Sequence, residues 1–177
     1  VGSLNYVTDR AANVVDVNIR MIANLYKIAE RIPDIVIINP IANCAYPGKM
    51  DIYSESDFWN GPIHPSVLSF GSTRRMIDVF AQSYKHQFGV RSINLITPNM
   101  YGPHDSIDPN KTHALNALVV KFLRAVKEGS LKVDVWGTGR PIREWLYVKD
   151  FAMVVKHVIE NPDKNMELVN IGQNNGY

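Results

Sequence analysis

Apolar side chains recur close to helical spacing in four stretches of the chain. The first covers residues 8–31, where Thr8 or Asp9 is predicted to cap the start and Pro33 lies just beyond the end. Its apolar positions are Val14, Val15, Val17, Met21, Ile22, Leu25 and Ile28. These are more apolar residues than one buried helix face needs, so the stretch predicts a helix with a second apolar surface.

Three further helices are predicted downstream. The second covers residues 65–88 and ends at Gly89, because glycine readily adopts the left-handed conformation that closes helices. Its apolar face consists of Met76, Val79, Phe80 and Tyr84. The third covers residues 113–128, and the fourth runs from a cap at Asp150 to about residue 160.

Short β-branched runs lie between these helices. Residues 34–39 are bounded by prolines and residues 91–97 are ended by Pro98; both runs are typical of strands buried on both faces of a parallel sheet. Shorter strands are predicted at 132–136, 144–148 and 168–171. The alternation of helix and strand in the first half favours βαβ units and an α/β fold.

A long segment rich in Pro, Gly and Asn covers residues 40–64. Loops of this length inside a compact domain are usually functional or disordered. The aromatic residues within it favour a packed, functional loop: Tyr46, Tyr53, Phe58 and Trp59.

Composition narrows the class of protein. The chain has 177 residues, of which 46% are hydrophobic and 20% charged, as in globular domains. The net charge is +2 and the basic residues are scattered, which argues against a nucleic-acid partner. No apolar run approaches the roughly 20 residues of a membrane span. The single cysteine, Cys44, excludes an internal disulfide and fits a reducing cytoplasm.

The most specific motif is the block TPNMYGPHD at residues 97–105, directly after a predicted strand. Ligands of open α/β sheets bind at the carboxyl ends of the strands, so this block marks a candidate site. Taken alone, it is equally compatible with a Pro/Gly turn that happens to contain an asparagine.

Two further blocks follow it, KTHALNALVVKF at 111–122 and VWGTGRPIREWLYVKD at 135–150. Together the three blocks resemble the extended short-chain dehydrogenases/reductases of the NAD-dependent epimerase/dehydratase family, and within them the GDP-L-fucose synthase group. The family pattern is N-x-Y-G-P-x-D, then S-H-x-x-x-A-L-x-x-K/R-F, then V-W-G-x-G-x-x-x-R-E-x-x-x-V-x-D; Thr112 replaces its serine. The resemblance extends back through NCAYPG at 43–48 and forward to NIG at 170–172.

This resemblance implies a Rossmann-like, doubly wound parallel sheet with a smaller, mixed α/β substrate-binding lobe. Residues 1–98 would form part of the dinucleotide-binding domain, and 99–177 mainly the substrate lobe, with segments returning to the sheet. The family's glycine turn, G-x-x-G-x-x-G, is not in this sequence and would precede Val1. Since the chain opens on Val1 rather than Met and stops after a predicted strand, we expect an internal piece of a longer protein.

The resemblance also implies substrate contacts. Asn99 would hold the nucleotide sugar near its diphosphate, Lys121 and Arg143 would face the phosphates, and Trp136 would contact the substrate. A guanidinium fork matches two phosphate oxygens at once, which suits Arg143 to this task. The alternative for Arg143 is a surface ion pair with Glu144.

Cys44 and His113 match the pair with which such epimerases move protons next to a sugar ketone. One group removes a proton from one face of the carbon and the other returns a proton to the opposite face. Free thiols and imidazoles titrate on either side of neutrality, so either residue could take either role. The alternatives are a small buried hydrophobic residue for Cys44 and a polar residue near a helix start for His113.

The sequence departs from the family at its redox centre, a Ser followed by Tyr-x-x-x-Lys. The three positions hold Ala42, Phe70 and Arg74. Phenylalanine lacks the hydroxyl that donates a proton, alanine lacks the hydroxyl that polarises the ketone, and arginine keeps only the charge. Arg74 and Pro98 would contact the cofactor, NADP or NAD. Tyr46, Ser69 and Ser72 lie close by, which leaves a different register or a displaced donor open.

The sequence therefore predicts a nucleotide-sugar epimerase or epimerase/reductase, with a GDP-4-keto-6-deoxyhexose-like substrate and an altered Ser/Tyr/Lys centre. The alternative is a non-catalytic family member that binds nucleotide sugar or dinucleotide. Relatives pair through two long helices, so a homodimer is expected through the helices at 8–31 and 65–88. No metal site and no membrane partner are predicted.

Overall fold

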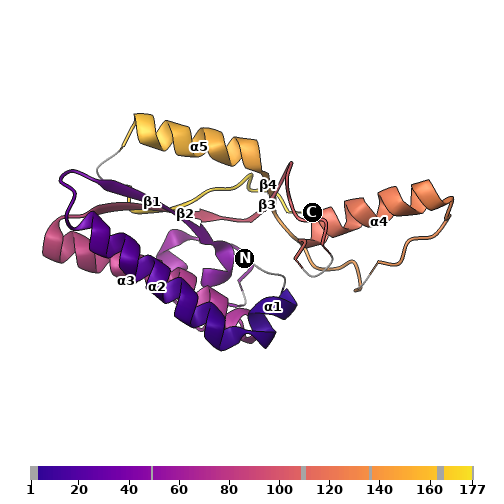
Figure 1. Ribbon diagram of the computed structural model, residues 1–177, viewed down its shortest axis with the longest axis horizontal. Helices are drawn as coiled ribbons and strands as arrows, with labels where there is room; N and C mark the ends of the chain where they lie inside the picture. The colour runs from indigo at the N-terminus through magenta and orange to yellow at the C-terminus, as the bar shows by residue number, and fades with distance from the viewer. Residues whose placement is uncertain (1–3, 49, 109–110, 136, 163–165, 177) are drawn as a thin grey trace.

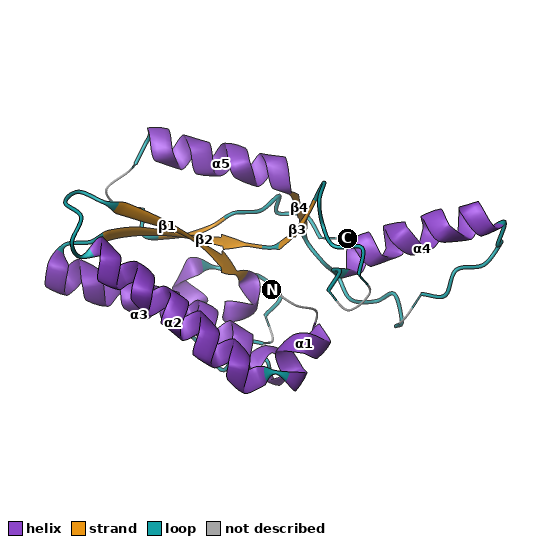
Figure 2. Cartoon of the chain, viewed as in Figure 1, coloured by secondary structure: helices purple, strands orange, loops and turns teal. Residues whose placement is uncertain are grey.

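A computed structural model of the protein describes residues 4–48, 50–108, 111–135, 137–162 and 166–176. The elements follow the order α1 (Leu4–Asp9), α2 (Ala11–Ala29), β1 (Val36–Ala42), η1 (Asn43–Ala45), η2 (Glu55–Asp57), η3 (Pro65–Val67), α3 (Leu68–Phe88), β2 (Arg91–Thr97), β3 (Asn99–Tyr101), α4 (Ala114–Glu128), β4 (Trp145–Tyr147), α5 (Val148–Glu160) and β5 (Leu168–Asn170), where η marks a 3-10 helix. Figure 2 shows the same elements by type.

The main sheet has the strand order β1-β2-β5, and all its neighbours are parallel. Helices α2 and α3 cover one face of this sheet and α5 covers the other (Figure 1). A second, two-stranded parallel sheet joins β3 to β4, and α4 lies beyond it, away from the main sheet (Figure 1). The α/β fold class with parallel strands is thereby confirmed; the division of the chain at residue 98 into two domains stays a prediction.

Both faces of β2 are buried, as its run of β-branched residues predicts. On the side of α2 and α3, Ile96 packs with Tyr26 and Ile77. On the side of α5, Ile93 and Leu95 pack with Val158. Burying each of these side chains stabilises the fold by roughly 1.5–3 kcal/mol. The sheet is thus a two-sided core, which gives the carboxyl ends of its strands a rigid base.

A buried polar network crosses this core. Asp78 of α3 accepts hydrogen bonds from Asn94 Nδ2 at 3.2 Å and from Trp59 Nε1 at 3.0 Å. Asn39 of β1 donates to Asn94 Oδ1 at 2.9 Å and to the Tyr26 hydroxyl of α2 at 3.0 Å. Polar groups in a core must be paired because leaving them unpaired is costly. The network therefore connects α2, α3 and the loop over residues 40–64 to strands β1 and β2.

The first predicted helix is wrong at its start. Two helices replace it, because α1 ends at Asp9 and α2 begins at Ala11. The N-cap of α2 is Arg10, with no capping bond from its side chain, so neither Thr8 nor Asp9 caps this helix. The break lets α1 bury Val7 and accept a hydrogen bond from Ser69 Oγ on α3 at its carbonyl.

The later helices differ from prediction only in detail. Residues 65–67 form a 3-10 turn before α3, and Gly89 ends α3 with φ 72°, as predicted. Val79 does not lie on the buried face; Ile77 and Ala81 are buried instead. The cap predicted at Asp150 is also wrong, because α5 begins two residues earlier and places Asp150 in its first turn.

The long central strands are predicted best. The strand at 91–97 is confirmed. The strand predicted at 34–39 is shifted: β1 begins at Val36 rather than at residue 34 and continues through Pro40 to Ala42. The strand predicted at 132–136 is wrong for residues 132–135, which have no regular structure, and Trp136 lies outside the described residues. There Asp134 uses its carbonyl to accept a hydrogen bond from Lys121 of α4 at 2.9 Å, rather than to join a sheet.

The loop over residues 40–64 is packed, as its aromatic residues predict. Tyr46 and Phe58 are buried, whereas Tyr53 and Trp59 keep about half of their surface exposed, 45% and 50%. The Arg75 guanidinium stacks on the rings of Phe58 and Trp59, 5.6 Å and 5.1 Å from their centroids. It also donates to the carbonyls of residues 45 and 61, so one side chain of α3 holds both ends of the loop.

Candidate functional site

The candidate site lies where β1 and β2 end. Ala42 and Thr97 are direct partners in the last register position of the two strands. The chain turns into η1 after Ala42, which places Cys44 just beyond this edge. Carboxyl ends of adjacent parallel strands meet at one edge of a sheet, where ligands of α/β folds bind. The structure thus gathers Ala42, Cys44 and the start of the 97–105 block at one place.

Cys44 is a partly buried free thiol. Burial raises its pKa to about 11, and the positive charge of Arg74 opposes that rise in pKa only in part. Thiolate is the nucleophilic and basic form of cysteine, so at neutral pH fewer than roughly one Cys44 in a thousand carries it. In the free protein Cys44 is a neutral thiol with a proton to donate.

Arg74 is held in place from two sides. One guanidinium nitrogen donates to Asn18 Oδ1 of α2, and the guanidinium carbon lies 5.0 Å from the centre of the Phe70 ring. Burial lowers the pKa of Arg74, although arginine stays charged at neutral pH. Among the described residues its buried Nε atom has no hydrogen-bond partner. One donor therefore remains for a bound group.

A close helix contact sets the distance between these residues. Gly71 lies in α3 against the backbone of η1, and a Cβ built on it would stand 2.5 Å from the carbonyl oxygen of Cys44. Only glycine permits this approach. Sequence reasoning missed both Gly71 and Asn18; for Gly71 the available signal is a glycine inside a helical pattern.

The predicted substrate residues lie on the second sheet and beside it. Asn99 begins β3 and pairs in register with Trp145 of β4, two residues after Arg143. Pro98, buried, links β2 to this strand. The ion pair considered for Arg143 is not formed among the described residues: Arg143 donates to its neighbour's carbonyl, while Glu144 accepts from the backbone N–H groups of residues 173 and 174, at 2.5 Å and 2.9 Å.

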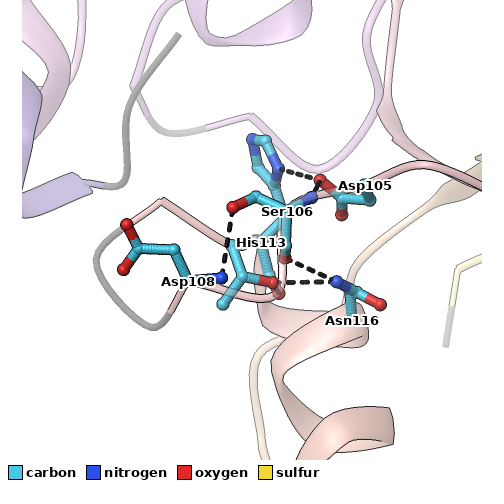
Figure 3. A network of polar contacts seen from close by, with 6 residues as sticks. Asp105, Ser106, Asp108, His113 and Asn116 are labelled. Carbon is cyan, nitrogen blue, oxygen red and sulfur yellow. Dashed lines mark hydrogen bonds and ion pairs between the residues drawn. The ribbon is translucent and has the colours of Figure 1, made fainter.

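His113 is the N-cap residue of α4 and lies 45% exposed beside Asp105 (Figure 3). Its Nδ1 atom is 3.8 Å from Asp105 Oδ1. The imidazole makes no capping hydrogen bond, so a structural role at the helix start does not account for it. Asp105 belongs to the 97–105 block, but sequence reasoning assigned it no role.

The structure does not bring all predicted residues together. Among the hydrogen bonds and ion pairs of the described residues, none joins Cys44 to His113. No three His, Cys, Asp or Glu side chains in the described ranges gather so as to hold a metal ion. None of the helices described is both long and apolar enough to cross a membrane.

Known proteins resemble the chain over most of its length. It is 29% identical over 133 residues to the GDP-L-fucose synthase of Dictyostelium discoideum, covering 75% of this chain and 41% of that protein. It is 32% identical over 121 residues to the GDP-L-fucose synthase of Escherichia coli (strain K12), covering 67% of this chain and 37% of that protein. The chain thus spans about four tenths of the length of these curated relatives.

A solved structure agrees with the fold. The GDP-L-fucose synthetase of Naegleria fowleri bound to NADP superposes with a TM-score of 0.83 at 23% identity, over 92% of this chain and 53% of that one. This likeness supports the Rossmann-like arrangement of strands and helices. The sequence model of the NAD dependent epimerase/dehydratase family matches residues 3–172. The chain belongs to the NAD dependent epimerase/dehydratase family.

Proposed function

We propose that the full-length protein is a nucleotide-sugar epimerase, or an epimerase/reductase with a weakened hydride step, acting on a GDP-4-keto-6-deoxyhexose-like substrate. The observation that carries this proposal is the neutral thiol of Cys44 beside Arg74 at the carboxyl edge of the sheet. The named relatives that act on GDP-sugars support the substrate class.

The surroundings of the two residues support different roles in proton transfer. Cys44 is neutral and serves as the acid, and His113, half-exposed and beside a carboxylate, serves as the base. The imidazole takes a proton from a carbon flanking the keto group, and the C–H electrons move into an enolate. The thiol then protonates the opposite face of that carbon. The resulting thiolate is stabilised by the Arg74 charge until it regains a proton from water.

The second sheet and α4 support the proposed substrate contacts. Arg143 is exposed and donates a hydrogen bond from Nη1 to the carbonyl of Ile142. Because this bond uses only one guanidinium nitrogen, the guanidinium can still face two phosphate oxygens. Lys121 supplies a second positive charge from α4, with its position set by the Asp134 carbonyl. Asn99 would bind near the diphosphate. Trp136, also assigned to the substrate, stays a prediction because it lies outside the described residues.

The cofactor, NADP or NAD, would supply or accept hydride when bound. The residues present fit it in part: the unpartnered Nε of Arg74 is a donor suited to a ribose hydroxyl. Pro98 would line the same edge. Phe70 has no hydroxyl to protonate the sugar oxygen, and Ala42 has none to polarise the ketone. Losing donor and polariser together is expected to slow reduction by several orders of magnitude.

The second candidate function is a non-catalytic family member that binds nucleotide sugar or dinucleotide. The identities of Ala42, Phe70 and Arg74 favour it. The retention of Cys44 beside Arg74 favours the epimerase, since a protein without catalysis has no use for a poised proton donor.

Solvent exchange separates the two candidates. Full-length protein incubated in D₂O with a GDP-4-keto-6-deoxyhexose is expected to place deuterium at ring carbons flanking the ketone, measured by mass spectrometry. A sugar ring free of deuterium would exclude the epimerase. Restoring the three redox residues (Ala42→Ser, Phe70→Tyr, Arg74→Lys) is expected to raise reductase activity; failure of that triple variant while it still binds nucleotide sugar favours the non-catalytic candidate.

A homodimer through α2 and α3 is the proposed assembly. Several apolar side chains of α2 lie on its outer surface: Val15, Val17, Met21, Leu25 and Ile28 are each at least 41% exposed. Contiguous apolar surface of this kind is typical of protein–protein contacts. Sedimentation of the full-length protein tests it, and Met21→Glu is expected to shift a dimer to monomers.

A further inference from the structure

We propose that Asp105 is a positioning residue that fixes the imidazole of His113 in the tautomer with the proton on Nδ1. This inference rests on the proposed function, because it assigns a base to that reaction. It starts from the contact between Asp105 Oδ1 and His113 Nδ1, at 3.8 Å. A carboxylate facing Nδ1 favours a proton on that nitrogen and leaves the lone pair of Nε2 free to accept one.

The carboxylate is held where it can act. Asp105 Oδ1 accepts a hydrogen bond of 2.7 Å from the backbone N–H of Ser106, and its side chain is only 24% exposed. The Ser106 carbonyl accepts from Asn116 Nδ2 at 2.8 Å, within the first turn of α4 (Figure 3). Asp105 is therefore tied to the same helix that His113 caps, and both partners share one rigid base.

The imidazole has no competing task. His113 stands at the N-cap with extended φ and ψ of −82° and 161°, and its ring makes no capping hydrogen bond. Asn116 also donates to Thr112 Oγ1 at 3.1 Å, which fixes the chain just before the histidine. The backbone is thus held on both sides while the ring stays half-exposed toward solvent.

The 3.8 Å separation exceeds a hydrogen bond, which spans roughly 2.7–3.2 Å between heavy atoms. Catalytic hydrogen bonds are often long in free proteins and shorten when substrate binds. A positioning role for Asp105 therefore requires the imidazole to rotate about its side-chain torsions and close this gap when substrate binds.

The other carboxylate of this loop provides a matched control. Asp108 Oδ2 lies 3.8 Å from Lys111 Nζ, the same separation as in the Asp105–His113 pair. Both are aspartates of one loop, and each lies 3.8 Å from a basic nitrogen. Asp105→Asn and Asp108→Asn therefore remove one charge each, but only the first changes the surroundings of the imidazole.

The test reads the tautomer directly. The full chain is labelled with ¹⁵N-histidine, and the His113 signals, assigned by their loss in His113→Gln, are recorded at a pH where the ring is neutral. We expect wild type and Asp108→Asn to hold the proton on Nδ1, whereas Asp105→Asn shifts the population toward Nε2. Asp105→Glu, which keeps the carboxylate, is expected to restore Nδ1 protonation. An unchanged Nδ1 population in Asp105→Asn overturns the proposal.

A kinetic readout follows from the same variants. Asp105→Asn is expected to lower the rate of solvent exchange into the sugar on the order of 100-fold, with Asp108→Asn within a few-fold of wild type. Equal rates in the two variants would contradict a positioning role. If the wild-type protein exchanges no proton, the proposed function fails, whereas the tautomer measurement still decides the role of Asp105.

Discussion

Cys44 and His113 form one proposed pair, yet the fold holds them in different ways. Cys44 lies at the edge of a two-sided core, against a helix backbone and beside a stacked arginine. His113 lies half-exposed at a helix start, in a loop held by its own short hydrogen bonds. Burial raises the pKa of the Cys44 thiol, whereas the proposed influence on His113 is the neighbouring charge of Asp105. An acid and a base that act together benefit from such unlike surroundings.

The largest expected effect is the loss of activity when Cys44, the residue at the packed edge of the sheet, is replaced. Cys44→Ala removes the proposed acid and is expected to lower the rate of epimer formation by roughly 10²–10⁴-fold, because the opposite face of the carbon loses its proton donor. Epimer formation is followed by NMR of the sugar, and thermal unfolding confirms that the variant is folded. Epimer formation at the wild-type rate would show that another group donates the proton.

The packed core is expected to contribute more to the free energy of unfolding than the loop around His113. Asp78→Ala leaves the buried Asn94 amide without this acceptor, also removes the acceptor of the Trp59 and Gln82 N–H groups, and is expected to cost about 3 kcal/mol of unfolding free energy. Asp108→Ala, in the exposed loop, removes one ion pair and is expected to cost less than about 1 kcal/mol. Urea unfolding measures both; similar costs would mean that the loop is as tightly integrated as the core.

The contact between α3 and η1 offers a narrower test. Gly71→Ala places a methyl group against the Cys44 carbonyl and is expected to destabilise the protein by about 2 kcal/mol. It should also speed alkylation of the thiol by iodoacetamide, because the thiol becomes more accessible. Ser83→Ala, on an exposed turn of the same helix, is the control and is expected to change stability by at most about 0.5 kcal/mol.

The smallest effect concerns pH. Because burial raises the pKa of Cys44 from 9.0 to about 11, the folded state holds the thiol proton more tightly than the unfolded state. The resulting stabilisation is complete below pH 9 and is lost as pH rises toward 11, by about 2 kcal/mol. Urea unfolding of wild type and Cys44→Ala at pH 8, 9.5 and 11 isolates this contribution. An equal loss of stability in both proteins would contradict a raised thiol pKa.

The predictions from sequence succeed where local pattern and tertiary burial agree. The run at 91–97 is β-branched and buried on both faces, so its pattern and its packing indicate the same strand. Gly89 ends α3 because glycine, which has no Cβ, adopts the left-handed conformation without a steric penalty. The run at 132–135 has a strand-like pattern, but there the Asp134 carbonyl pairs with Lys121 of α4.

The predicted N-terminal helix caps are wrong because local sequence alone does not fix where a helix begins. Thr8 and Asp9 are good capping residues, yet the helix begins after them because α1 turns aside to bury Val7. Asp150 follows the true start of α5 by two residues. Such boundaries depend on which neighbour covers the segment, and a local pattern does not contain that neighbour.

The sequence by itself determined the α/β fold class and the family, because these follow from periodicity and motif. Only the tertiary structure decided that burial raises the pKa of the Cys44 thiol, that Gly71 sets its distance from α3, and that Asp105 faces His113. The physical reason is that a pKa or a ring orientation depends on burial and on charges within a few ångströms. For Cys44 these come from Arg74 and Gly71, on a helix well separated from it in the sequence.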